Sequence, residues 1–305
     1  MRDLRKSLHS HIRHYFHYRL KLRPPVFHLR GRHATATTIA PNYGEFLMEE
    51  AVLLQHLGKD ALGKWPKPAS LHMLMLKAVR EHTHDLPIDR KHSVSLRYTG
   101  LYRAELSILA PGSNSSLLAI NDAAGWQPDI QKNLADWFKI RIKHQGLQLQ
   151  RIACYLNAWA DFHPNRLQGF AWLLPLDILA ARYFQADIGR DDKSLARTAA
   201  AIAEAAPSDL SASIPFAGLN DLPWLLSQEE SRRFFQSLEA LAKRSRLAVL
   251  TKDKVHACAI WRSLLGDRFP MAGVKKRKFE SGPSGLPYKR PYPDTVFTNT
   301  LLFGV

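Results

Sequence analysis

The chain of 305 residues contains no apolar run approaching the ~18 residues that a membrane-spanning helix needs. Its first residues, Met1–Lys6, also lack the apolar stretch of a secretory signal peptide. We therefore expect a cytoplasmic protein with no membrane partner. Only two cysteines are present, Cys154 and Cys258, and both lie in apolar helical patterns. This predicts two buried free thiols in a reducing compartment and argues against a disulfide framework.

Acidic residues are scarce as well. The chain has 27 Asp and Glu against 43 Lys and Arg, a formal net charge of +16 at pH 7. Residues 2–32 hold nine Lys and Arg against one acid, and residues 275–290 hold six against one. This balance favours a polyanionic partner such as nucleic acid, a nucleotide or an acidic protein. The alternative is a solubilising surface with no specific ligand. The candidate anion-binding residues are Arg5, Arg13, Arg19, Lys275, Lys276 and Arg277.

Hydrophobic periodicity divides the chain into a mixed first half and a helical second half. Apolar residues at helical spacing from Leu4 to Leu20 predict an amphipathic helix with a basic outer face. Beyond it we expect strands over 26–29, 46–54, 93–98 and 102–109, with a helix over 69–83. After Pro128 the pattern is helical, with predicted helices around 134–142, 147–159, 170–184, 194–206, 228–250 and 252–264. The predicted fold class is α+β, with a core over 1–140, a helical lobe over 141–270 and a basic Pro/Gly-rich tail over 271–305.

Three groups of segments resemble one known family. The first group is Leu29–Arg32 with Thr37 and then Glu45–Leu54, and the second is Leu101–Leu109. The third, in the helical half, comprises Gly125-Trp126, Asp129, Leu134–Phe138, Leu149–Ile152 and Tyr155–Asp161, with a closing Trp261–Pro270 segment. Together they are similar to the bacterial cGAS/DncV-like nucleotidyltransferases, the CD-NTases of CBASS antiphage signalling.

The resemblance implies a bilobed nucleotidyltransferase fold. In this family a polymerase-β-like twisted mixed sheet with flanking helices carries the active site, and a helical lobe follows it. Active members use Mg²⁺ to join nucleoside triphosphates into cyclic oligonucleotides, and the nucleotides bind between the two lobes. The order of predicted strands and helices agrees with this arrangement.

The positions that would carry the chemistry depart from the family pattern. Aligned with the three metal-binding aspartates are Leu47, Glu49 and Glu105, and no register of the 46–54 strand places two acids two residues apart. Leu47 cannot bind a metal ion. Glutamate in place of aspartate displaces the carboxylate by over ~1 Å, and misplacement on that scale costs ~10²-fold in rate. Glu45 and Glu50 are acids that could be recruited instead.

The phosphate-binding positions change as well. The family's Gly-Ser turn reads Gly31-Arg32 here, with Thr37 following, and a phosphate-binding lysine of the family is replaced by Asn157. By the resemblance, these positions and the replaced acids would all lie around the phosphate groups of the same nucleotide. Arg32 could pair with Glu49 or Glu105 and occupy the position of the missing metal ion.

The main hypothesis is a degenerate CD-NTase, a pseudoenzyme that acts by binding a partner protein, a nucleotide or nucleic acid in antiphage defence. An active CD-NTase or another defence protein is a candidate partner, and no cofactor is expected. One alternative is an active Mg²⁺-dependent enzyme that makes cyclic di- or oligonucleotides with Glu49 and Glu105 as ligands. Another is a basic nucleic-acid-binding module.

Overall fold

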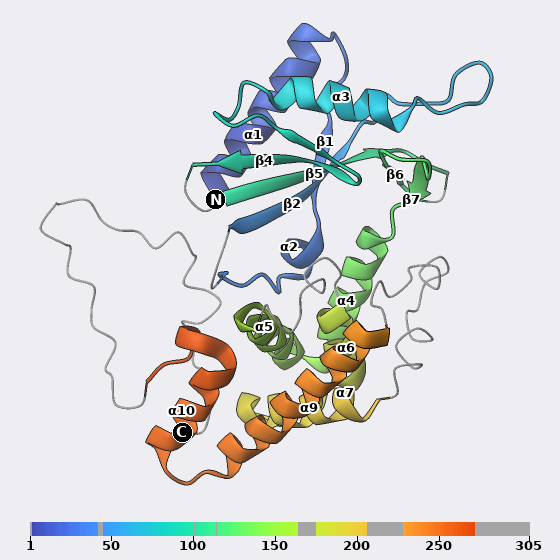
Figure 1. Ribbon diagram of the computed structural model, residues 1–305. Coiled ribbons are helices and arrows are strands. Elements are labelled where there is room, and N and C mark those ends of the chain that lie inside the picture. The colour runs from blue at the N-terminus through green and yellow to red at the C-terminus, as the bar shows by residue number, and fades with distance from the viewer. Residues whose placement is uncertain are drawn as a thin grey trace, which may run out of the picture. The chain divides into compact units, whose positions relative to one another are not determined.

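The computed structural model describes residues 2–41, 45–99, 102–113, 115–163, 175–205 and 228–271. The chain forms two compact units (Figure 1). The first comprises Met1–Ala36 and Gly44–Asp136, and the second comprises Thr37–Tyr43 and Trp137–Val305. The predicted basic tail, apart from Met271, lies outside the described residues.

The first unit is a mixed sheet with flanking helices. Its order is α1 (Arg2–His14) with a π-helical continuation (Tyr15–Arg19), β1 (Val26–Leu29), α2 (Gly31–Thr35), β2 (Phe46–Leu53), α3 (Pro68–Val79), β3 (Ile88–Arg90), β4 (Ser93–Tyr98), β5 (Tyr102–Ala110), β6 (Leu117–Ala119) and β7 (Trp126–Pro128). The strands follow the order β1-β2-β5-β4-β3, and β6 pairs with both β5 and β7. β2 and β5 run parallel, whereas the other pairs are antiparallel.

Strand alternation gives this sheet one apolar face and one polar face. Successive side chains of a strand point to opposite faces, so Met48 and Val52 of β2 share a face with Ala104 and Leu106 of β5. The helices α1 and α3 cover that face, as Figure 1 shows. Fully buried side chains of α1, such as Leu8, complete the core. The opposite face carries the charged side chains of Glu49, Arg103 and Glu105 as well as the apolar Leu47.

The second unit is helical in its described part. It contains most of α4 (Gln131–Gln145), then α5 (Leu147–Phe162), α6 (Pro175–Tyr183), α7 (Asp191–Glu204), α9 (Gln228–Leu250), α10 (Lys254–Leu265) and a 3₁₀ turn (Gly266–Arg268). Large buried side chains from different helices form its core, among them Phe138, Trp159, Phe234 and Trp261. Cys154 and Cys258 are both buried and are not joined in a disulfide, as predicted.

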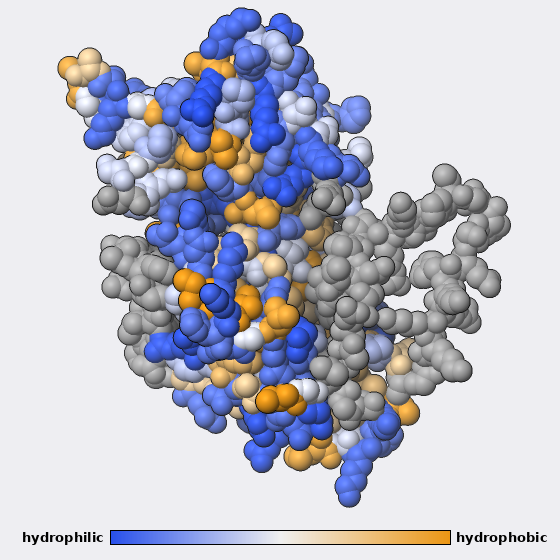
Figure 2. Space-filling model, turned by 180° about the vertical axis from the view of Figure 1, so that it is seen from behind, coloured by the Kyte–Doolittle hydropathy of each residue, from blue (hydrophilic) through white to orange (hydrophobic). Residues whose placement is uncertain are grey.

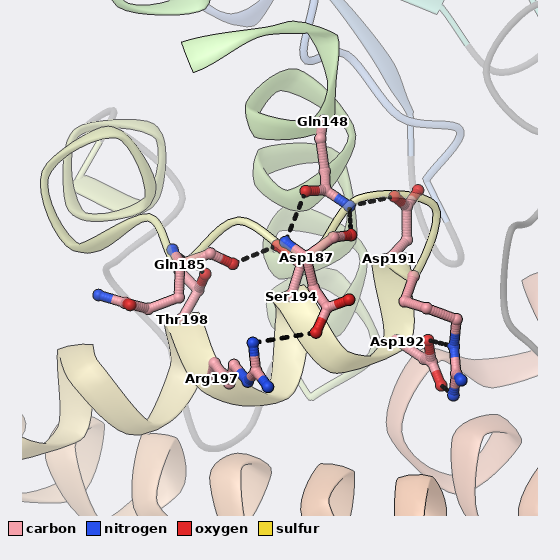
Figure 3. Close-up of polar contacts among 9 residues, drawn as sticks. Gln148, Gln185, Asp187, Asp191, Asp192, Ser194, Arg197 and Thr198 are labelled. Carbon is pink, nitrogen blue, oxygen red and sulfur yellow. Dashed lines mark hydrogen bonds and ion pairs between the residues drawn. The ribbon is translucent and has the colours of Figure 1, made fainter.

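A polar network joins α5 to the start of α7 (Figure 3). The side chain of Gln148 accepts a hydrogen bond from the Asp187 backbone N–H at 3.0 Å and donates to the Asp187 carbonyl at 2.8 Å. It also donates to Asp191, whose fully buried carboxylate receives two bonds from Arg151 at 2.6 and 2.9 Å. Charge-assisted bidentate bonds of this kind satisfy a carboxylate that burial would otherwise penalise.

The surface seen in Figure 2 is mostly hydrophilic, with hydrophobic residues in small separate patches. Within the described ranges, no helix has the length and hydrophobicity required to cross a bilayer.

The predicted elements and the observed ones agree for the strands β1, β2, β4 and β5 and for the helices of the second half. The short strands β3, β6 and β7 were not predicted. The helix expected over 69–83 ends at Val79. The helix expected over 170–184 is seen over Pro175–Tyr183, and residues 164–174 lie outside the described residues.

Candidate functional site

The parallel pairing of β2 and β5 brings the predicted acid positions together. In this register Glu49 lies beside Glu105, and Leu47 lies beside Arg103. All four residues are on the polar face of the sheet, because they alternate with the core residues of the same strands. The sequence-predicted positions 47, 49 and 105 therefore share one face, and an arginine that was not predicted as a site residue lies among them.

Glu105 is surrounded by groups of this chain that stabilise its charge. Only 6% of the residue is exposed. Its Oε1 lies 3.3 Å from Nε of Arg103 and 3.5 Å from Nε of Arg90, and its Oε2 accepts a hydrogen bond from Ser93. The two guanidinium nitrogens are at ion-pair distance but lack hydrogen-bond geometry, so Oε1 has no hydrogen-bond partner in the described structure. Two arginines therefore supply positive charge where a metal-binding carboxylate would need a cation.

Glu49 is pressed against the turn that begins α2. Gly31 has a φ of +54°, and a Cβ built on it would lie 2.0 Å from Oε2 of Glu49. Glycine is favoured here, because it tolerates positive φ and leaves room for the Glu49 carboxylate, which a Cβ would force to move. Burial raises the pKa of Glu49, while the nearby Arg32 and Arg30 oppose that shift. Glu105 adds a further upward contribution, since a second negative charge disfavours ionisation.

Arg30 is a site residue that sequence reasoning missed. It is only 5% exposed, and it donates to Asp129 and Gln131 at 3.0 Å each. Its Nη1 has no hydrogen-bond partner in the described structure. Burial lowers the pKa of Arg30, and the nearby Asp129 and Glu49 act in the opposite direction. A buried guanidinium with an unused donor, close to Glu49, is suited to contact an anion.

The proposed pairing of Arg32 is not what the structure contains. Among the described residues, no ion pair joins Arg32 to Glu49 or Glu105. The positive charge of Arg32 lowers the pKa of Glu49 from a greater distance. Arg103 and Arg90 take the role instead. A signal for Arg103 was present in the sequence, because it lies two residues before Glu105 and so shares its face of the strand.

The two acids that could have been recruited are engaged elsewhere. Glu45 pairs with Arg97 at 2.6 Å and with Arg103 at 3.8 Å. Glu50 points to the opposite, helix-covered face, where it is fully buried, forms an ion pair with Arg5 and shares a hydrogen bond with His9 of α1. Glu50 is therefore part of the core of the unit and is separated by the sheet from Glu49 and Glu105.

Thr37 and Asn157 belong to the second unit. Both donate to the buried carboxylate of Asp177, Thr37 through its hydroxyl at 2.6 Å and Asn157 through its amide at 2.8 Å. The structure thus brings these two predicted phosphate-binding residues together around one acid. Their side chains hold α5 and α6 to the segment that follows Ala36.

The predicted basic residues of α1 have different surroundings. Arg5 is committed to Glu50, whereas Arg13 lies over the Phe27 ring at 5.2 Å. Arg19 ends the π-helical segment. An open groove of about 510 Å³ follows this surface, lined by Lys6, His9, Ser10, Arg13, His14, His17, Tyr18 and Pro24. Lys275, Lys276 and Arg277 lie outside the described residues.

The polar sheet face does not fit Mg²⁺. This ion needs hard oxygen ligands in near-octahedral geometry, and two-metal catalysis needs shared carboxylates. Here an aliphatic side chain, Leu47, lies beside Glu49, and Arg103 lies beside Leu47 on the neighbouring strand. Arg103 and Arg90 are at ion-pair distance from the buried carboxylate of Glu105. Within the described residues, no group of three or more His, Cys, Asp or Glu side chains is arranged to hold a metal ion.

The first unit is a mixed sheet that carries Glu49 and Glu105 on one face of a parallel strand pair, and a helical unit follows it in the chain. This is the arrangement of the nucleotidyltransferase fold. Solved structures of DncV share this fold. Escherichia coli DncV in its 3'-deoxy GTP bound form is 16% identical, with a TM-score of 0.63 over 80% of this chain and 70% of that chain. Vibrio cholerae DncV cyclic AMP-GMP synthase with nonhydrolyzable GTP is 15% identical, with a TM-score of 0.64 over 81% and 70%. No family model matches the sequence.

Proposed function

We propose that this chain uses the nucleotidyltransferase fold to bind a phosphate-bearing ligand without transferring nucleotides. The observation that carries the proposal is the placement of Arg103 beside Leu47 and against Glu105. A guanidinium adjacent to the remaining acids repels Mg²⁺ and attracts phosphate oxygens. We infer that the chain is a binding member of the CD-NTase group, with no catalytic cofactor.

The charges around the site support anion binding. Four guanidinium groups lie near the two glutamates: Arg30, Arg32, Arg90 and Arg103. Arg97 is a fifth, because it pairs with Glu45, which also lies near Arg103. The acids Glu45, Glu49, Glu105 and Asp129 offset four of these five charges, which leaves one in excess. Because burial also raises the pKa of Glu49, protonation of that group would increase the excess. Planar guanidinium forks suit phosphate oxygens geometrically.

The active-enzyme alternative predicts a different response to the same substitution. If Glu105 binds Mg²⁺, Glu105→Gln abolishes activity and weakens nucleotide binding. If the arginines bind phosphate, removing one negative charge from the site strengthens ATP binding by about fivefold or more. Equilibrium binding of ATP, measured with Mg²⁺ and with a chelator, separates the two. We expect affinity that persists in chelator and rises in the Glu105→Gln variant.

Catalysis is tested directly with radiolabelled ATP and GTP in the presence of Mg²⁺ or Mn²⁺. We expect no cyclic or linear oligonucleotide, with Vibrio cholerae DncV as the positive control. Formation of a product that disappears in Glu105→Ala would overturn the proposal. ATP affinity that vanishes with chelator and falls in Glu105→Gln would also contradict it.

A biological role as a partner in antiphage signalling fits a binding protein of this fold. We propose that the chain acts beside an active CD-NTase or another defence protein in the cytoplasm. Co-purification with a candidate synthase, and a change in that synthase's product yield when the chain is added, tests this role. An unchanged yield together with no complex on size-exclusion chromatography would exclude it.

Nucleic-acid binding is a second candidate function, and the groove along α1 favours it. Lys6, Arg13 and three histidines line this groove, and its lining contains no acidic residue. Contacts with a phosphate backbone release counterions, so affinity for a short duplex should fall steeply with salt. The double variant Lys6→Gln/Arg13→Gln should reduce that slope by about two phosphate contacts. An affinity that does not change with salt would exclude this candidate.

A further inference from the structure

The turn between α9 and α10 presents aliphatic side chains to solvent. We call residues 243–255 the α9–α10 corner. Leu247, Leu250 and Val255 are 55%, 68% and 67% exposed, although apolar residues of the same helices fill the core of the unit. Figure 1 shows the corner at the end of the helical unit, beyond α5 and α7.

The same corner is strongly basic. Its cations are Lys243, Arg244, Arg246, Lys252 and Lys254, and its single acid is Asp253. Arg246 and Leu247 follow Lys243 by three and four residues, and Leu250 follows them by four and three, so these side chains share one face of α9. Arg244 donates to Ser263, whereas no ion pair in the described structure uses Lys243, Arg246 or Lys254.

Backbone caps hold the corner in one conformation. The hydroxyl and the N–H of Thr251 both donate to the Leu247 carbonyl, at 2.8 and 3.0 Å. The carboxylate of Asp253 accepts from the Val255 N–H at 3.0 Å and so caps α10. The one acid of the corner is therefore used for capping. The exposed aliphatic and basic side chains are presented on a preorganised turn, which lowers the entropic cost of binding.

The positive charge of the α9–α10 corner limits the kinds of partner that can bind there. The chain's own C-terminal segment is an unsuitable occupant, because residues 275–290 carry six Lys and Arg against Glu280. A second copy of the corner is repelled for the same reason. A nucleic acid would use the cations but would gain little from three exposed aliphatic side chains. An anionic bilayer surface would use both kinds of side chain. The aliphatic side chains would enter its interface, and the surrounding Lys and Arg would reach its headgroups.

We propose that the α9–α10 corner is a peripheral binding site for an anionic lipid surface. Leu247, Leu250 and Val255 insert among the headgroups, and Lys243, Arg246 and Lys254 pair with their phosphate and carboxylate groups. Our expectation of no membrane partner rested on the lack of spanning apolar runs, and surface binding of this kind requires no span. The contact is independent of the polar sheet face in the first unit.

Co-sedimentation of the full chain with vesicles tests the proposal. The probes are phosphatidylcholine vesicles with about one-third phosphatidylserine, and phosphatidylcholine alone. We expect binding to the anionic vesicles only. Each cation near an anionic surface is worth about fivefold, so Lys243→Gln/Arg246→Gln/Lys254→Gln should lower partitioning by about a hundredfold. Leu247→Ser/Leu250→Ser keeps the charge and should lower it by about tenfold.

The matched control is Lys59→Gln/Lys64→Gln/Lys67→Gln, which removes the same charge from exposed residues of the first unit. It should change partitioning by less than about threefold. An equal loss in this control, or full binding by the leucine variant, would mean general attraction by net charge and would overturn the proposal. No binding of the wild-type chain to anionic vesicles overturns it as well. Unchanged circular dichroism and melting temperature establish that each variant is folded.

Discussion

Replacing Arg5 with methionine should destabilise the first unit, because Arg5 neutralises a buried acid. The Glu50 side chain is 0% exposed, that of His9 is 12% exposed and that of Arg5 is 37% exposed. Breaking a buried ion pair by removing one partner costs ~3–5 kcal/mol. His9 still contacts the second oxygen of Glu50, and Arg5 is partly solvated, so we expect a loss of about 2–3 kcal/mol. Methionine retains the apolar stem, which limits the change to the charge.

Urea and thermal unfolding followed by circular dichroism measure this loss. For a unit of this size, we expect a decrease of roughly 10 °C in melting temperature. The matched control is Lys6→Met, which removes the neighbouring, exposed charge and should change stability by less than about 0.5 kcal/mol. The double variant Arg5→Met/Glu50→Met should recover most of the loss, because it replaces the pair with apolar side chains. Equal stability of the Arg5→Met and Lys6→Met variants would refute the reasoning.

Two further predictions concern the turn at Gly31. Gly31→Ala should cost roughly 2 kcal/mol in urea unfolding, since alanine would be strained at this positive φ and the Glu49 carboxylate would have to move away from its Cβ. Gly63→Ala, where φ is also positive but no atom lies within 4 Å, should cost only ~1 kcal/mol, and equal costs would contradict the packing argument. Because the pKa of Glu49 is raised above 4.5, the folded chain holds this proton more tightly than the unfolded chain. That stabilising contribution is lost as pH rises, so Glu49→Gln should become more stable relative to wild type from acid to neutral pH, and a constant difference would exclude it.

The sequence was sufficient to predict the strands that carry the acids. The apolar run from Phe46 to Leu54, interrupted by Glu49-Glu50, predicts β2, and the alternation from Tyr102 to Leu109 predicts β5. Once β5 is assigned, its period of two places Arg103 and Glu105 on one face. The sequence could therefore have shown that Arg103 and Glu105 lie close together. Their position beside Leu47 and Glu49 could be known only from the pairing of β5 with β2.

Long-range pairings could not be predicted from local pattern. The parallel register that sets Leu47 beside Arg103 joins positions 56 residues apart, and Arg30 finds Asp129 at a separation of 99 residues. Arg90 comes from β3, a strand of three residues that is too short to show a periodic pattern. These contacts form only when distant segments pack together, so the pattern of a short stretch of sequence cannot predict them.

The neighbours Glu49 and Glu50 illustrate why residue type alone was ambiguous. One position along the strand moves a side chain to the other face of the sheet, so Glu50 is neutralised by α1 while Glu49 meets the turn at Gly31. Each acid on β2 and β5 therefore has its own cationic neighbours: Arg5 for Glu50, Arg32 and Arg30 for Glu49, and Arg103 and Arg90 for Glu105.

Two carboxylates facing each other across a parallel strand pair repel one another, so a cation has to lie close to them. In a metal-dependent transferase that cation is Mg²⁺, whereas here Arg103 and Arg90 hold the position against Glu105. An aspartate placed at position 47 would consequently lie beside the guanidinium of Arg103, and it would form an ion pair more readily than it would bind a metal ion. We therefore expect that Leu47→Asp alone would not create a Mg²⁺ site, because Arg103 would still lie beside position 47.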